Sequence, residues 1–185
     1  MCDQCWGALL PSRGADRPSY VQRIIVGFAY DSTLRSIVHR FKFEGGRGLA
    51  LPLAGVLDKR LHFTGQIPQS GILLPVPSHT SRLRERGFNP AEEIARHLAN
   101  HWGIEARPEL AKRTIAGAHQ SSLPDERRKN TLEGAFRVKP PQNDEANAPL
   151  ILFDDVIHTG NTLRRLGEAA KRAGWKRIEA ICLCK

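Results

Sequence analysis

The chain has 185 residues, of which 41% are hydrophobic and 25% are charged, a composition that is typical of a globular domain and excludes a largely disordered chain. It contains no apolar run near the roughly 20 residues of a membrane span, and its first residues lack the pattern of a secretory signal, so we expect a cytoplasmic protein without a membrane span. The 28 Lys and Arg against 19 Asp and Glu give a net charge of +9, which favours phosphate-bearing ligands or nucleic acid as partners.

Strand and helix patterns alternate along the first hundred residues. A run rich in β-branched and aromatic residues at 24–30 predicts a strand. Apolar residues at helical spacing predict a helix at 32–43 and a second one at 48–61. A short apolar run at 71–77 predicts the next strand. The helix expected at 89–103 has Asn as its cap, Pro in its first turn and Gly at its end.

The second half of the chain continues this alternation. A polar and basic connection is expected at 107–131, a strand at 134–138 and a loop at 140–149. The next expected elements are a strand at 150–153, a turn, a helix that runs through Lys171 and a final strand at 177–184. Apolar strands that alternate with helices predict an α/β domain around a mostly parallel sheet flanked by helices. We expect residues 71–185 to form its core and residues 21–65 a small N-terminal subsidiary region or flap.

The segment LILFDDVIHTGNT contains the strongest functional signal in the sequence. Its apolar run brings Asp154 and Asp155 to the carboxyl end of a strand, where parallel sheets bind ligands. The turn after them opens a helix whose free amides suit a phosphate, and Gly160, Thr159 and Thr162 allow close approach and add donors. Because carboxylates repel phosphate, they suit the vicinal hydroxyls of a sugar. The segment therefore predicts a ribose 5-phosphate site.

Two other interpretations of this segment are open. The acids and the turn can be a solvated loop with an ordinary helix cap, and paired aspartates at a strand end can hold Mg²⁺ in a phosphotransfer site. The first does not explain why apolar run, acids and turn follow one another in this order. The second does not require a phosphate-binding turn directly downstream. The ribose 5-phosphate site accounts for all three features.

The same segment resembles the phosphoribosyl pyrophosphate (PRPP) signature of type I phosphoribosyltransferases. Further segments at 28–45, 75–99 and 112–136 resemble the competence-associated ComF/GntX family of these proteins, and RLRERGFNPAE is particularly specific. The resemblance implies a type I phosphoribosyltransferase-like fold and a Mg²⁺-dependent transferase that acts in competence and DNA uptake. It would move phosphoribosyl from PRPP to an unknown acceptor and release pyrophosphate.

The resemblance also assigns residues to the site. It implies that Asp154 and Asp155 are catalytic and hold the ribose hydroxyls, and that the residues around the 5-phosphate are Ile157, His158, Thr159, Gly160, Asn161 and Thr162. Ile157 and His158 stand where the family has small hydroxyl residues, but the backbone amides are retained. A pyrophosphate loop after the strand at 71–77 is implied at Val76, Pro77, Ser78, His79 and Arg82.

Residues 112–130 are long for a connection within a compact domain, which favours a functional lid. In type I phosphoribosyltransferases a mobile loop closes over the active site, and the residues here that match the family pattern are Gln120, Arg127 and Asn130. A lid would shield a cationic ribosyl centre from water. A plain basic surface loop is the alternative.

The four cysteines form two close pairs. Cys2 and Cys5 resemble half of the family's N-terminal zinc ribbon, so residues 1–20 are interpreted as a partial or degenerate ribbon. A structural Zn²⁺ needs four ligands, and no second CxxC follows, so a Zn²⁺ site in this chain would need Cys182 and Cys184 to complete it, and a degenerate ribbon is the preferred interpretation. Cys182 and Cys184 would share one face of the last strand, where we expect core thiols.

A second function also fits the basic charge, namely a non-catalytic competence protein that uses the same fold to bind single-stranded DNA and works with other DNA-uptake proteins. The expected nucleic-acid contacts are Arg82, Arg84, Arg86, Arg128 and Lys129. If the segment around the first three is extended, all three point to one side. Aromatic residues make up only 6% of the chain and do not alternate with the basic runs, so base stacking is not evident. A PRPP-sensing regulator would use the same site and has no sequence mark of its own.

Overall fold

The structure is a computed structural model that describes residues 20–114 and 135–185. In chain order its elements are β1 (Arg23–Phe28), α2 (Ser32–Phe43), the 3₁₀ turn η1 (Gly46–Leu49), α3 (Ala50–Phe63), β2 (Ile72–Pro75), α4 (Thr80–Arg86), α5 (Pro90–Trp102), β3 (Glu105–Ala106), η2 (Pro108–Leu110), β4 (Ala111–Arg113), β5 (Phe136–Val138), η4 (Asn143–Asn147), β6 (Pro149–Val156), α7 (Asn161–Arg172) and β7 (Arg177–Cys184). All the predicted strands and helices are present. The strand expected at 150–153 is longer than predicted and ends at Val156.

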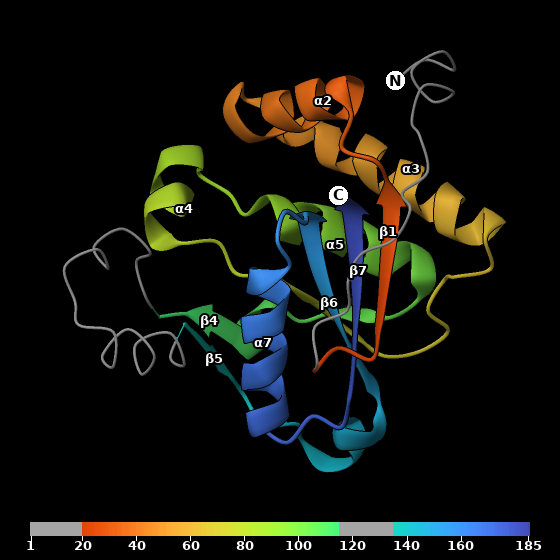
Figure 1. The fold of residues 1–185 in the computed structure, drawn as a ribbon, viewed down its shortest axis with the longest axis vertical. Helices are drawn as coiled ribbons and strands as arrows, with labels where there is room; N and C mark the ends of the chain where they lie inside the picture. The colour runs from red at the N-terminus through yellow and green to blue at the C-terminus, as the bar shows by residue number, and fades with distance from the viewer. Residues whose placement is uncertain (1–19, 115–134) are drawn as a thin grey trace.

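Five strands form one parallel sheet in the order β1-β7-β6-β2-β3, which confirms the predicted α/β class. Because parallel neighbours need crossover connections, helices cover the sheet. Figure 1 shows α7 on one face, α5 on the other, and α2 beyond the arrowheads of β6 and β7. β4 and β5 form a separate antiparallel pair. The arrangement is compatible with the predicted type I phosphoribosyltransferase-like fold.

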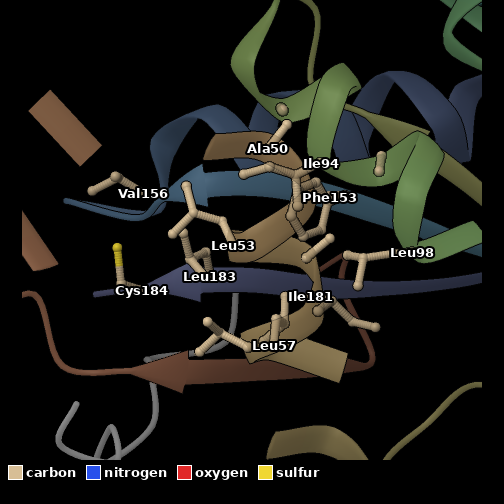
Figure 2. Close-up of a cluster of buried hydrophobic side chains, with 14 of the residues drawn as sticks. Ala50, Leu53, Leu57, Ile94, Leu98, Phe153, Val156, Ile181, Leu183 and Cys184 are labelled. Carbon is tan, nitrogen blue, oxygen red and sulfur yellow. The ribbon is translucent and has the colours of Figure 1, made fainter. Parts of the chain in front are cut away.

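Two buried apolar layers hold the sheet between its helices. Along β6, Leu150 and Leu152 belong to the layer beneath α7, whereas Ile151 and Phe153 belong to the layer beneath α3 and α5. Both faces of this strand are therefore buried, which is why it is a continuous apolar run without alternation. Figure 2 shows the second layer, in which side chains of α3 and α5 meet those of β6 and β7. Among the described residues, no helix has both the length and the apolar character needed to cross a membrane.

The start of α5 differs in detail from the prediction. Asn89 is the residue at its N-cap, but the side chain makes no capping hydrogen bond. Instead, Asn89 Nδ2 donates to the carbonyl of Val76 at 3.0 Å, and its Oδ1 accepts from Ser78 Oγ at 2.9 Å. The tertiary contact outcompetes the local cap, and it fixes the loop after β2 to the beginning of α5.

Close packing of α3 on the sheet depends on Gly27 in β1. A Cβ atom at this position would lie 2.5 Å from Leu57 Cδ1 of α3 and 3.0 Å from the carbonyl oxygen of Leu183 in β7. Leu57 is fully buried, so it has little room to move. Only glycine therefore lets α3 lie this close to β1.

We expect Gly27→Val to lower the free energy of unfolding by about 1–3 kcal/mol, because overpacking a core costs about this much. The control is Gly55→Ala in α3, where a new Cβ meets open space. It should leave stability unchanged or raise it by up to about 1 kcal/mol through helix propensity. Chemical denaturation followed by circular dichroism measures both variants. Unchanged stability of Gly27→Val would contradict the packing of α3 on β1.

Candidate functional site

A pocket of about 170 Å³ lies at the C-terminal edge of the sheet, where β2 and β6 end. Its walls come from α2, the loop after β2, α4, the start of α5, β4 and the turn before α7. The residues of the predicted site that it brings together are Asp154, Asp155, His158, Thr162, Val76, Pro77, Ser78, His79 and Arg82. The predicted acidic, phosphate and pyrophosphate segments thus meet at one pocket, although they are far apart in the sequence.

The sequence predicted the acidic pair directly after the end of this strand. In the structure both residues lie inside β6. The difference arises because β6 stays paired with β7 beyond Phe153, with Asp154 opposite Cys182 and Val156 opposite Cys184. Asp154 Oδ1 also accepts a hydrogen bond from the amide of Asp155 at 3.0 Å. Both carboxylates line the pocket, and the sheet holds their backbone rigidly in place.

Asp155 forms an ion pair with a residue that the sequence analysis did not select. Its Oδ2 lies 2.5 Å from Lys42 Nζ near the end of α2, and the two side chains are only 10% and 19% exposed. The contact has the distance of an ion pair but not the angles of a hydrogen bond. The pair connects α2 to the end of β6. The only sequence signal for Lys42 was its place in the segment 28–45, which resembles the family.

The environment of Asp154 favours its protonated form. Burial raises the pKa of Asp154 well above its ordinary value, and the neighbouring Asp155 carboxyl raises that pKa further. Lys42 partly offsets this shift. Perturbed carboxyl groups in a cleft are typical of functional sites.

α4 corrects the prediction for the three alternating arginines. Thr80–Arg86 form a helix and not an extended segment, so alternate side chains point to nearly opposite sides. Arg82 and Arg86, one turn apart, line the pocket, whereas Arg84 is exposed and does not. The three therefore form no single row of charge.

The pocket carries more positive than negative charge. Arg82, Arg86 and Arg113 line it together with Lys42 and the two aspartates. Burial lowers the pKa of Arg86 and of Arg113, and repulsion from Arg82 lowers both further. Asp155 raises the pKa of Arg86 and Asp154 raises the pKa of Arg113, which partly offsets these shifts. Crowded cations of this kind suit a polyanionic ligand. Sequence analysis missed Arg113 because nothing in the chain order places β4 beside β6.

The turn between β6 and α7 offers backbone donors. Gly160, with a φ of 71°, stands at the N-cap of α7, a helix of 12 residues. Within the described part of the chain, the amides of this turn that donate to no other residue are those of His158, Thr159, Gly160 and Thr162. Free amides at the start of a helix are a suitable receptor for phosphate.

Not every residue of the predicted phosphate turn is available. Ile157 is buried, and its amide donates to the carbonyl of Cys184 at 2.9 Å, so it has no donor left for a ligand. Thr159, Gly160 and Asn161 belong to the turn but not to the pocket wall. His158 is exposed and lines the pocket, in edge-to-face contact with Tyr30 at 6.0 Å between ring centroids.

The two C-terminal cysteines are buried free thiols, as expected for core residues. Cys182 packs in the layer beneath α7 and Cys184 in the layer beneath α3, so they do not act as a pair on one face as predicted. No cluster of three metal-binding side chains occurs within residues 20–114 and 135–185. The predicted residues that lie outside the described ranges are Cys2, Cys5, Gln120, Arg127, Arg128, Lys129 and Asn130.

The parallel sheet, with an acidic pair and cations at its C-terminal edge, defines an α/β protein of the class that binds ligands at this edge.

No family model matches the chain. The chain is 29% identical to DNA utilization protein YhgH of Salmonella typhimurium, over all of this chain and 84% of that protein. It is 28% identical to the protein of the same name from Escherichia coli strain K12, with the same coverage. Competence protein F of Haemophilus influenzae is 28% identical, over 91% of this chain and 74% of that protein. These similarities confirm the predicted resemblance to the competence-associated ComF family.

Asp154→Asn should stabilise the fold at neutral pH. Because the pKa of Asp154 is raised in the native state, the unfolded chain releases this proton first, and the wild type loses stability as the pH rises above the ordinary value of 3.8. The difference in unfolding free energy between the variant and the wild type should be absent below that pH. It should grow as the pH rises from there to the raised pKa of the native state. Urea denaturation at a series of pH values measures this advantage. The exposed control Asp144→Asn should show no such growth, and a pH-independent advantage of Asp154→Asn would contradict the assignment.

Proposed function

We propose that the protein binds PRPP in this pocket and is a Mg²⁺-dependent phosphoribosyltransferase-like protein that acts in competence or DNA uptake. One observation carries the proposal: Asp154 and Asp155 line one pocket with the arginine-bearing loop and helix after β2, and the turn with free amides before α7 follows them directly in the chain. PRPP carries matching groups, a ribose diol between a phosphate and a pyrophosphate.

Each part of the ligand has a partner of suitable chemistry. The 5-phosphate fits the amides at the start of α7. The ribose hydroxyls fit the carboxyl oxygens of Asp154 and Asp155, which accept hydrogen bonds. The pyrophosphate fits the loop after β2 together with Arg82, Arg86 and Arg113, all of which line the pocket. The carboxylate oxygens are also ligands that suit Mg²⁺, which PRPP would bring with it and which would neutralise part of the pyrophosphate charge.

Transfer would break the bond between the ribose C1 and a pyrophosphate oxygen while a bond from C1 to the acceptor forms. The pyrophosphate leaves with the electron pair. The contribution of this chain would be to position the donor and to stabilise charge. Asp154 and Asp155 face the ribosyl centre, where positive charge develops, and the arginines face the departing pyrophosphate.

The double variant Asp154→Asn/Asp155→Asn should bind Mg²⁺-PRPP at least about tenfold more weakly than the wild type, because a hydrogen bond to a charged group contributes about 1.5–3 kcal/mol. Isothermal titration calorimetry measures the affinity. Asp144→Asn is the matched control, since it removes an exposed carboxylate in η4. The single variant Asp154→Asn keeps the ion pair between Lys42 and Asp155 and separates loss of ligand from loss of fold. Equal affinity of the double variant and the wild type would overturn the site.

Turnover is tested separately from binding. The protein is mixed with Mg²⁺-PRPP and candidate acceptor bases, and pyrophosphate release is followed. Release that depends on Asp154 and Asp155 supports a transferase. PRPP binding without release from any mixture would argue for a binding or sensing role of the same pocket.

A second candidate function is the handling of single-stranded DNA. The relatives described above are named DNA utilization protein or competence protein, and the chain carries a net charge of +9. The structure adds that Arg84 is exposed on α4 and points away from the pocket, so it is available to a second ligand. Arg82 and Arg86, in contrast, would contact either ligand.

Arg84→Ala should weaken binding of single-stranded DNA and reduce the slope of log affinity against log salt by about 0.7, the value for one lost phosphate contact. Its affinity for Mg²⁺-PRPP should not change, whereas Arg82→Ala should weaken both. Fluorescence anisotropy of a labelled oligonucleotide at several salt concentrations measures the DNA affinity. Lys171→Ala, at the far end of α7, is the control for general loss of charge. If log affinity falls with log salt at the same slope for Arg84→Ala and the wild type, the DNA does not bind at Arg84.

A further inference from the structure

Phe43 is an exposed aromatic residue beside the pocket. It is the last residue of α2, and half of its surface is exposed. It directly follows Lys42, whose side chain reaches Asp155. Phe41, two positions earlier, is fully buried and packs against Phe88. The core therefore uses one phenylalanine of this helix end and leaves the other at the surface.

Planar side chains from two helices contact the ring of Phe43. The Cζ atom of Arg86 in α4 lies over the Phe43 ring, 4.4 Å from its centroid. The ring of His39, one turn earlier on α2, lies 5.0 Å away with an interplanar angle of 37°. Leu83 is one turn before Arg86 on α4 and is 43% exposed. We call these four residues the Phe43 rim. Figure 1 shows that α2 and α4 lie next to each other beyond the edge of the sheet.

The exposure of the rim is not typical of the rest of the surface. Within the described ranges, five large hydrophobic residues are exposed, and two of them, Phe43 and Leu83, flank Arg86. Clustered exposed apolar side chains mark interaction sites. The rim is also positively charged, because Arg86 takes part in it and Arg82 and Arg84 lie on the same short helix. Buried Arg86 Nε has no hydrogen-bond partner.

These features fit a ligand with exposed flat bases and a negative backbone. We propose that the Phe43 rim is a stacking platform for a base of single-stranded DNA, with the neighbouring phosphates on the arginines of α4. This proposal deepens the DNA-binding function and rests on it. Stacking of a base on an aromatic side chain is tolerant of sequence and contributes about 1–3 kcal/mol. In a duplex the bases are already stacked on one another, so the rim selects single strands.

The test compares Phe43→Ala and Phe43→Trp with the wild type. Fluorescence anisotropy measures binding of a labelled oligodeoxynucleotide, an abasic oligomer of the same length, and a duplex. Phe43→Ala should bind the oligonucleotide about 5- to 150-fold more weakly, the equivalent of one lost stacking contact. It should bind the abasic oligomer as the wild type does, and Phe43→Trp should retain the affinity for bases. Phe63→Ala is the matched control, since Phe63 is 86% exposed at the end of α3.

Unchanged oligonucleotide binding by Phe43→Ala, or an equal loss with the abasic oligomer, would overturn the platform while the DNA-binding function stands. If the wild type binds no single-stranded DNA, the DNA-binding function itself fails. If Phe43→Ala changes only the use of free bases as acceptors with PRPP, the rim belongs to the acceptor-binding site and the DNA proposal is overturned. Titration of Mg²⁺-PRPP in the same preparations reports whether the pocket is intact.

Discussion

The ion pair between Lys42 and Asp155 is the contact on which the functional edge of the molecule depends. It compensates a carboxylate that is almost fully buried, and removing one partner of such a pair costs several kcal/mol because the other charge stays buried. It also fixes the end of α2 against the end of β6. The positions of Phe43 and of its contact with Arg86 follow from this connection, as does the closed wall of the pocket on that side.

The pocket is electrostatically unfavourable without a ligand. Burial, together with the neighbouring Asp155 carboxyl, raises the pKa of Asp154, and burial together with Arg82 lowers the pKa of Arg86 and of Arg113. Like charges are thus crowded in the same cavity. A ligand that carries anionic groups on either side of a neutral diol relieves the repulsion among the cations and gives the carboxyl groups hydrogen-bond donors. Natural proteins retain such destabilising arrangements where function requires them.

α4 connects the two proposed functions. It has only seven residues, and its two sides face different environments. Arg82 and Arg86 face the pocket, while Arg84 is exposed to solvent. Arg86 also lies over the Phe43 ring. A ligand in the pocket would therefore change the charge that a DNA strand meets at the rim. The helix is short and ends at Gly87, which has a φ of 78°, so the chain returns at once to the start of α5.

Sequence alone determined the α/β class, the positions of the longer strands and helices but not of α4, β3 and β4, and the acidic segment with its phosphate turn. These features are local, because apolar periodicity, caps and the order of acids and glycine are all contained in short runs of residues. Whether the arginines after β2 form one row depended on an extended segment, and alternation in sequence does not reveal that this segment is a helix of two turns.

Tertiary structure alone decided the rest. Lys42 meets Asp155, Arg113 meets the pocket, and Phe43 meets Arg86 only because a parallel sheet brings distant segments to one edge. No aromatic residue is interleaved with the arginines at 82–86 in the sequence, yet folding places Phe43 beside Arg86. Contacts between residues far apart in the chain depend on strand order and helix placement, which no local pattern records.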